Sequence, residues 1–345
     1  MKCFAWLAGL AILLGAGTRV QAAEVVFVTG GGSYQSATRE AWLTPFSQKT
    51  HITILEDTGV LLAKVRAMVE SGVVSWDLIG MGGAAFMQGV QLGLFQKIPD
   101  GIVDRSKLIP NAWNEYGVPS EMFSIVMGYS TNAFPTNAPR TFADFWDVKK
   151  FPGQRILPAR PTGLLEVALL ADGVSPKQVY PTLSTPAGLA RALNKIRAIR
   201  PYVSLWWSSA AQSVMALASG EAVMALGWNG RFQDAIDARM PIAISWNQSV
   251  TQIGYYLLLK GAPDRDAALA LLHYISSLEA QSRLSRYLAY GPVRTDAWAL
   301  LDAKTKARLP PEPVPGSDTL VIDIGWWAAH VADITPKLVA IMQGG

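Results

Sequence analysis

The stretch EVVFVTGGGSYQSATREAWLTPFSQKT, residues 24–50, decides the fold class. Residues 24–31 predict a strand that ends in a glycine turn. Residues 35–50 predict a helix, because their apolar side chains recur at helical spacing: Ala37, Ala41, Trp42 and Phe46. A strand, a glycine turn and a helix in this order are typical of an α/β sheet.

The same alternation continues along the chain and predicts a parallel, doubly wound sheet. Proline-marked residues 131–146 follow a predicted strand at 122–130 and indicate a crossing into a second lobe, where the alternation begins again. Further strands are predicted at 51–57, 76–83, 155–159, 203–207, 222–228 and 252–259, the last returning to the first lobe. Further helices are predicted at 61–72, 163–172, 210–219, 264–288, 295–308 and 326–343.

The first 22 residues predict a signal peptide. Lys2 gives a positive start, an apolar run follows, and small residues precede a cleavage site after Ala22. The run is shorter than the roughly 20 residues that span a bilayer. We therefore expect export to the periplasm, with Cys3, the only cysteine, removed.

The remaining chain divides into a first α/β lobe at 23–130, a second at 131–251, and a return with C-terminal helices at 252–345. A hinge is expected near 129–133 and 250–255. The chain has 30 basic and 26 acidic residues and no basic block, so no nucleic-acid partner is expected.

Three strand ends are rich in glycine: TGGGSY at 29–34, GMGGAA at 80–85 and GWNGR at 227–231. Ligands of open α/β sheets bind at the carboxyl ends of strands, and glycine lets a ligand approach backbone N–H groups closely. We therefore expect ligand contacts at Gly31, Ser33, Gly82 and Gly83. The alternative is that these glycines only form turns.

Four segments carry a family resemblance: residues 76–98, 141–157, 219–232 and the tryptophan pair of the final helix. Together they resemble the periplasmic solute-binding proteins of ABC transporters, of the polyamine (spermidine/putrescine) type. The resemblance implies a two-lobed periplasmic binding protein fold, type II-like, with a ligand cleft between the lobes. It also implies a monomer without enzymatic activity or cofactor, which delivers a small molecule to an inner-membrane ABC permease and its ATPase.

The ligand is expected to differ from a polyamine. The resemblance implies carboxylates for the ammonium groups, but the corresponding stretches carry Arg160, Thr162, Gly163 and Gly254. An unpaired buried charge costs several kcal/mol, so a dication fits poorly there. The sequence therefore favours a small organic anion or zwitterion, such as a carboxylate, an amino acid or a phosphonate; a polyamine receptor is the alternative.

Arg231 is the residue we expect to bind the acid group, through two parallel hydrogen bonds. Trp228 and Trp207 are expected to form apolar walls, and Ser208 and Ser209 to donate hydrogen bonds from the start of a helix near Ala210. Two alternatives stay open. Arg231 would pair with Asp234 on the surface, and the serines would only cap their own helix.

Glu121 is the acid expected to bind an amine, if the ligand has one. Arg160, Thr162 and Tyr255 are weaker candidates, and Arg160 would otherwise be a solvated loop residue. Tyr255 and Tyr256 resemble the paired tyrosines of ferric-ion receptors, but neighbours on a strand face opposite sides and no metal-ligand cluster accompanies them. No nucleophile motif supports a hydrolase, so no catalytic residue and no metal are expected.

Overall fold

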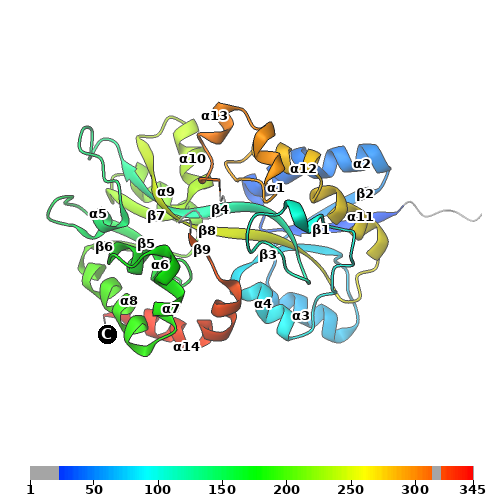
Figure 1. Cartoon of the computed structure of the whole chain (residues 1–345), viewed down its shortest axis with the longest axis horizontal. Coiled ribbons are helices and arrows are strands. Elements are labelled where there is room, and N and C mark those ends of the chain that lie inside the picture. Colours follow the sequence, from blue (N-terminus) through cyan, green and yellow to red (C-terminus); the bar gives the residue numbers. More distant parts are fainter. Residues whose placement is uncertain (1–22, 313–319, 345) are drawn as a thin grey trace, which may run out of the picture.

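The computed structural model describes residues 23–312 and 320–344, and the predicted signal peptide lies outside these residues. Nine strands of the described chain form one sheet in the order β2-β1-β3-β8-β4-β7-β5-β6, with β9 paired to β8 (Figure 1). The strands are β1 Glu24–Thr29, β2 Thr53–Thr58, β3 Leu78–Gly82, β4 Val118–Ser130, β5 Arg155–Pro158, β6 Val203–Trp207, β7 Met224–Trp228, β8 Ile242–Leu258 and β9 Leu320–Val321.

Two long strands join two groups of parallel strands. β1 pairs in parallel with β2 and β3, and β5 pairs in parallel with β6 and β7. β4 and β8 lie between the groups and are antiparallel to each other and to their outer neighbours. They run across the centre of Figure 1 from one lobe to the other. The predicted two-lobed α/β fold is therefore confirmed.

Helices flank both groups of strands (Figure 1). The first lobe holds α1 Gly32–Thr38, α2 Thr44–Thr50, α3 Leu62–Ser71, α4 Gly83–Gln91, α11 Arg265–Ile275, α12 Leu278–Leu284 and α13 Ala303–Lys306. The second holds α5 Phe142–Trp146, α6 Leu164–Ala171, α7 Val179–Leu183, α8 Pro186–Ile199, α9 Ala210–Ala218 and α10 Asn229–Asp237.

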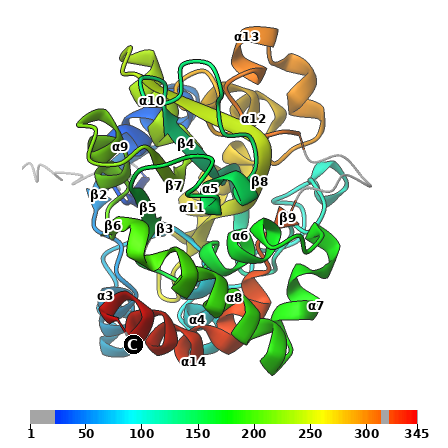
Figure 2. The same ribbon diagram turned by 90° about the vertical axis from the view of Figure 1, so that its left-hand side faces the viewer.

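The C-terminal helix α14, Ile324–Gln343, contacts both lobes. It packs against α4 of the first lobe and α8 of the second. Figure 2 shows it, in red, passing along the bottom of the molecule beside both helices. It is therefore a third connection between the lobes, in addition to β4 and β8.

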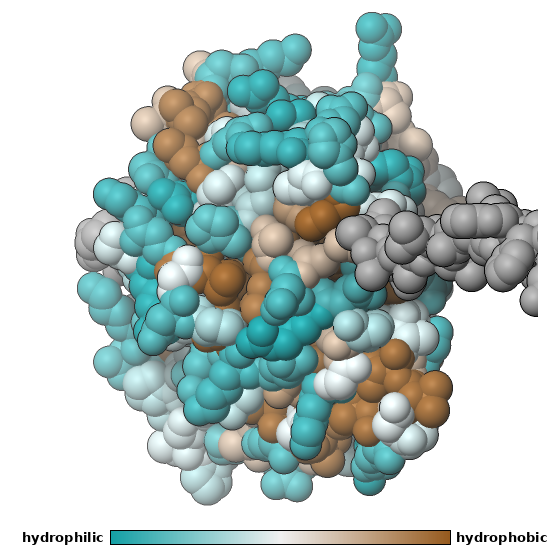
Figure 3. Space-filling model, turned by 90° about the vertical axis from the view of Figure 1, so that its right-hand side faces the viewer, coloured by the Kyte–Doolittle hydropathy of each residue, from teal (hydrophilic) through white to brown (hydrophobic). Residues whose placement is uncertain are grey.

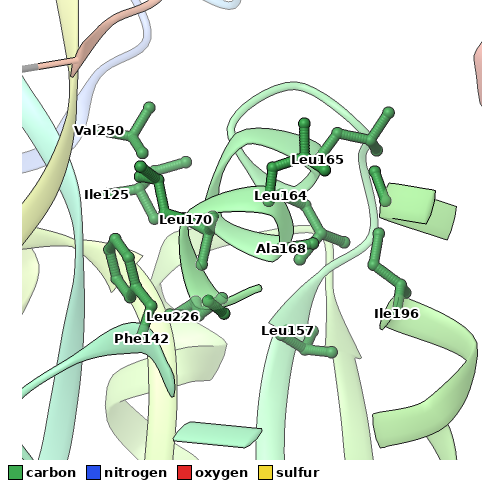
Figure 4. Packing of buried hydrophobic residues seen from close by; sticks show 14 of the residues in the cluster. Ile125, Phe142, Leu157, Leu164, Leu165, Ala168, Leu170, Ile196, Leu226 and Val250 are labelled. Carbon is green, nitrogen blue, oxygen red and sulfur yellow. The ribbon is translucent and has the colours of Figure 1, made fainter. Parts of the chain in front are cut away.

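Each lobe has its own apolar core. Figure 4 shows part of the largest cluster, in which α6 buries Leu164, Leu165 and Ala168 against β4, β5 and β7 of the second lobe. The first lobe has two further clusters, around Trp42 and around Phe86. Because β4 and β8 contribute residues to the cores of both lobes, each anchors one end in each lobe.

Some predicted helices are interrupted. The stretch 35–50 contains a π-helical turn at Arg39–Leu43 between α1 and α2. The stretch 264–288 forms α11 and α12, because Ser277 caps a new helix by accepting a hydrogen bond from the Ala280 amide. The stretch 295–308 forms a 3₁₀ turn at Asp296–Leu300 and the short α13. α4, α5, α7, α8 and α10 were not predicted as helices.

No helix within the described residues is long and apolar enough to cross a membrane. Figure 3 shows the outer end of the first lobe, where hydrophilic residues cover most of the face and apolar residues lie in separate patches. Large exposed apolar side chains of this lobe include Leu61 and Val73.

Candidate ligand-binding site

A cavity of about 290 Å³ lies between the lobes. It receives side chains from both lobes and from the crossing strands β4 and β8. Its lining residues are Tyr34, Gly80, Met81, Gly82, Glu121, Phe123, Trp228, Arg231, Gly254, Tyr255 and Tyr290. Of the residues expected at the site, it therefore brings together Gly82, Glu121, Trp228, Arg231 and Tyr255.

Glu121 reaches the cavity because β4 is irregular at this point. Pro119 pairs with Tyr255 and Glu121 with Gly254, so two steps along β4 match one along β8. Such a bulge turns a side chain away from its regular direction. The carboxylate lies directly over Gly254, where an added Cβ would be 2.0 Å from Glu121 Oε1. The glycine found in place of an expected acid therefore makes room for an acid on the neighbouring strand.

Glu121 is buried and only half satisfied. The Tyr34 hydroxyl donates to Oε1 at 3.0 Å and also lies 3.0 Å from the Tyr256 hydroxyl. Oε2 accepts no hydrogen bond from any described residue. Burial raises the pKa of Glu121 from 4.5 to about 7, although the neighbouring hydroxyls of Ser120 and Tyr34 act in the opposite direction. The carboxylate therefore has one oxygen that accepts from Tyr34 and one buried oxygen without a partner among the described residues.

Three aromatic rings form a continuous wall. Phe123 stacks on Tyr290 with ring centroids 5.0 Å apart and meets Trp228 edge-on at 5.1 Å. The sequence predicted Trp228 alone. Phe123 could have been found from Glu121, since residues two apart on a strand share a face. Tyr290 follows α12 in an irregular segment, and no sequence pattern indicated it.

The residues after Trp228 join the two lobes. Asn229 accepts a hydrogen bond from the Ser124 amide at 2.9 Å and donates to the Ala289 carbonyl at 2.5 Å. Gly230 allows Tyr290 to approach, because an added Cβ would lie 2.6 Å from that ring. The WNG sequence therefore supplies a cavity wall, an amide link and a close contact in three consecutive residues.

Arg231 is in the first turn of α10, directly after Gly230. Its Nη1 donates to the Ser33 hydroxyl of the first lobe at 2.5 Å and lies 3.8 Å from Asp234. The alternative pairing with Asp234 is thus present. Arg231 lines the cavity while its guanidinium binds groups of both lobes.

Arg160 lies between two tryptophan rings of the second lobe. Its guanidinium carbon is 4.4 Å from the centroid of Trp207 and 4.8 Å from that of Trp228. Its buried Nε and Nη2 atoms have no hydrogen-bond partner within the described chain. Burial lowers the pKa of Arg160 from 12.5 to about 10, so the side chain stays charged at neutral pH. It is therefore not the solvated loop residue of the alternative hypothesis.

The other expected contacts lie outside the cavity lining. Ser208 and Ser209 are exposed, and their amides donate to Gln212 Oε1 at 2.9 and 3.0 Å. The local helix thus uses the donors that were expected to bind an anion. Trp207 is buried and supports Arg160. Gly31 and Gly83 adopt positive φ at the starts of α1 and α4, Ser33 binds Arg231, and Thr162 precedes α6.

Tyr255 and Tyr256 face opposite sides of β8, as predicted. Tyr255 packs in the Phe86 cluster and donates to the Ala112 carbonyl, whereas Tyr256 packs in the Trp42 cluster. Among the residues that the structure describes, no group of His, Cys, Asp and Glu side chains could hold a metal ion.

A two-lobed α/β protein with a cavity between its lobes has the architecture of a periplasmic ligand receptor. A family model described as bacterial extracellular solute-binding protein matches residues 41–311. The chain therefore belongs to the bacterial extracellular solute-binding proteins.

Individual relatives agree with this family. A gamma-aminobutyric acid-binding protein of Pseudomonas aeruginosa is 32% identical over 340 residues, covering 98% of this chain and 96% of that protein. The binding protein MotA from A. tumefaciens B6, solved with glucopine, is 33% identical with a TM-score of 0.84, covering 92% and 99% of the two chains. A substrate-binding protein of an ABC transporter from Bradyrhizobium japonicum USDA 110 is 32% identical with a TM-score of 0.86, covering 93% and 100%.

The protein is thus the substrate-binding component of an ABC importer and delivers a small molecule to a membrane permease. The resemblance to polyamine receptors was correct for the class of transport protein. Its narrower part, the polyamine subfamily, is not supported by these relatives, two of which are described with gamma-aminobutyric acid and glucopine and none with a polyamine.

Proposed function

We propose that this receptor binds a small zwitterion with an amine at one end and an acid group at the other, of the size of gamma-aminobutyric acid (GABA). The observation that carries the proposal is the unpartnered Oε2 atom of Glu121 in the cavity lining. A ligand ammonium group there restores the hydrogen bond and the counter-charge that the buried carboxylate lacks.

The size and shape of the cavity support a short ligand. Its volume of about 290 Å³ is at the lower end of the range of about 300–1,000 Å³ for ligand pockets. The rings of Phe123, Trp228 and Tyr290 offer an apolar surface to a short methylene chain. The relative described as a GABA-binding protein agrees with this class.

A polyamine fits this lining less well. Two ammonium groups need two buried counter-charges, and Glu121 is the one acid among the lining residues. The cationic Arg231, also in the lining, repels a second ammonium group. We therefore favour the zwitterion over a dication.

The narrower expectations on export and assembly are part of the proposal. We infer cleavage after Ala22, a periplasmic location and a monomer without cofactor. Mass spectrometry of the exported protein should find Ala23 at its N-terminus, and retention of residues 1–22 would contradict the cleavage site.

Isothermal titration calorimetry with four compounds tests the proposed ligand: GABA, n-butylamine, butyrate and putrescine. GABA should bind most tightly. Glu121→Gln should weaken GABA at least tenfold, because a charge-assisted hydrogen bond contributes about 1.5–3 kcal/mol, and should leave butyrate unaffected. Glu115→Gln, at an acid paired with Lys97 outside the cavity lining, is the control. A preference for putrescine over GABA in the parent protein contradicts the proposal.

A further inference from the structure

We infer that Arg160, and not Arg231, binds the acid group of the ligand. This inference rests on the proposed function, since it assigns the second charged end of the same ligand. It reverses the order in which the sequence ranked the two arginines.

The environment of Arg160 is that of a receptor group without its ligand. The rings of Trp207 and Trp228 meet edge-on at 73°, and the guanidinium carbon lies 4.4 and 4.8 Å from their centroids, so both rings make cation–π contacts with Arg160. The buried Nε and Nη2 atoms find no acceptor in the described residues. These are two adjacent donors on one edge of the fork, the geometry that a carboxylate accepts through two parallel hydrogen bonds.

Two other arginines of the second lobe show what satisfied guanidinium groups look like in this protein. Arg155, fully buried, donates to the carbonyl oxygens of Phe145, Gly153 and Phe151 at 3.1, 2.6 and 2.5 Å. Arg231 binds Ser33 and lies beside Asp234. The donors of Arg155 are used within its own lobe and those of Arg231 at the lobe boundary, whereas two donors of Arg160 are unused.

The position of Arg160 suits a ligand that also reaches Glu121. Trp228 lies on Arg160 and at the same time lines the cavity that Glu121 lines. Arg160 therefore stands beside the aromatic wall, and Glu121 is in the lining itself. A ligand whose ammonium group binds Glu121 and whose chain follows Trp228 directs its acid group toward Arg160.

The test compares four proteins: the parent, Arg160→Met, Arg160→Lys and Arg231→Gln. Methionine keeps an apolar chain between the tryptophan rings and removes the charge. Arg140→Gln, at an exposed arginine of the same lobe, is the matched control for the loss of one positive charge. Calorimetry measures the affinities for GABA, butyrate and n-butylamine, and thermal unfolding verifies that each variant is folded.

Arg160→Met should weaken GABA at least about 30-fold and abolish butyrate binding, while n-butylamine binds as to the parent. Arg160→Lys should recover part of the loss, since it keeps the charge without the fork. The unliganded Arg160→Met protein should melt no lower than the parent, because it loses an unpaired buried charge. Arg231→Gln should weaken all three compounds by a similar, smaller factor.

The outcomes separate this inference from the proposed function. Unchanged GABA affinity in Arg160→Met overturns the inference and leaves the zwitterion proposal in place. Binding of butyrate that depends on Arg160, without binding of GABA, supports the inference and overturns the zwitterion. If Arg160→Met does not fold, equal affinity of Arg160→Lys and the parent for butyrate overturns the inference. A parent protein that binds neither GABA nor butyrate overturns both.

Discussion

At the scale of single residues, the cavity keeps an acid group in an unfavourable state. Glu121 is buried, has one unpartnered oxygen, and has a folded-state pKa of about 7 against an ordinary value of 4.5. Between these values the folded state holds a proton that the unfolded chain has lost. The free energy of unfolding is therefore highest, as far as Glu121 determines it, below pH 4.5, where the group is protonated in both states. It falls by about 3 kcal/mol as the pH rises from 4.5 through 7, because the folded protein must then bury the charge or hold the proton.

Glu121→Gln should remove this dependence on pH. Its free energy of unfolding, measured with urea, should exceed that of the parent by more at pH 8 than at pH 5, because glutamine has no charge to bury. Saturating GABA should stabilise the parent protein at pH 8 and the variant much less. Parallel pH profiles of the parent and Glu121→Gln would show that the carboxyl titrates normally.

Gly254→Ala tests the close approach of β8 to Glu121. A Cβ there would lie 2.0 Å from Oε1, so the carboxylate must move out of its position. We expect at least tenfold weaker GABA binding and a loss of about 1–3 kcal/mol in stability from overpacking. Gly30→Ala is the control, since a Cβ at that position meets nothing within 4 Å. Equal GABA affinity of the parent and Gly254→Ala would refute a role for this space.

The sequence predicted the chemistry of these residues better than their positions. Glu121, Trp228 and Arg160 were identifiable because acids, aromatic rings and arginines at the ends of strands that border a cleft often contact the ligand. The bulge that aims Glu121 was not predictable, since it depends on the pairing of β4 with β8. The partner of Arg231 was not predictable either, because Ser33 comes from the other lobe.

At the scale of elements, α10 of the second lobe makes side-chain contacts with residues of the first lobe. Arg231 donates to Ser33, Asp234 accepts from Ser33 at 3.5 Å, and Arg308 donates to Asp237. α10 was not predicted as a helix, because its WNG sequence has a turn-like composition. Its register follows from β7, which ends at Trp228 and continues directly into the helix.

Arg231→Ala should weaken the closed arrangement without altering which ligand is preferred. One partly exposed contact contributes about 1 kcal/mol, so affinities for GABA, butyrate and n-butylamine should all fall about fivefold. A double-mutant cycle with Ser33→Ala measures the coupling between the two residues. The effects of the two substitutions on ligand affinity should be nonadditive, because either one breaks the same hydrogen bond. A selective loss of butyrate binding in Arg231→Ala would return Arg231 to the role of acid-binding residue.

At the scale of the whole molecule, the lobes share the paired strands β4 and β8, and a side-chain hydrogen bond links these strands at the point where they pass from one lobe to the other. Met122 and Ile253 pack in the first lobe, whereas Ile125 and Val250 pack in the second. Between them the Ser124 and Thr251 hydroxyls form a buried hydrogen bond at 2.9 Å. The division into lobes at 130 and 251 and the hinge near 129–133 and 250–255 stay predictions, and this packing favours a bend nearer 123–125 on β4.

Crosslinking tests whether the lobes open and close about this crossing. Ser33 and Asp234 face each other across the lobe boundary, and Cys3 is the one natural cysteine, in the predicted signal peptide. In Ser33→Cys/Asp234→Cys, a disulfide can form only while the lobes are closed. Saturating GABA should speed its formation under mild oxidation, because a ligand that contacts both lobes favours the closed state.

Small-angle scattering of the parent protein should show compaction with GABA. α14 contacts both lobes and must then shift against α4 or α8 as they move. If the disulfide forms at the same rate with and without GABA, and the scattering envelope is unchanged, the lobes are held in one arrangement and the crossing is not a hinge.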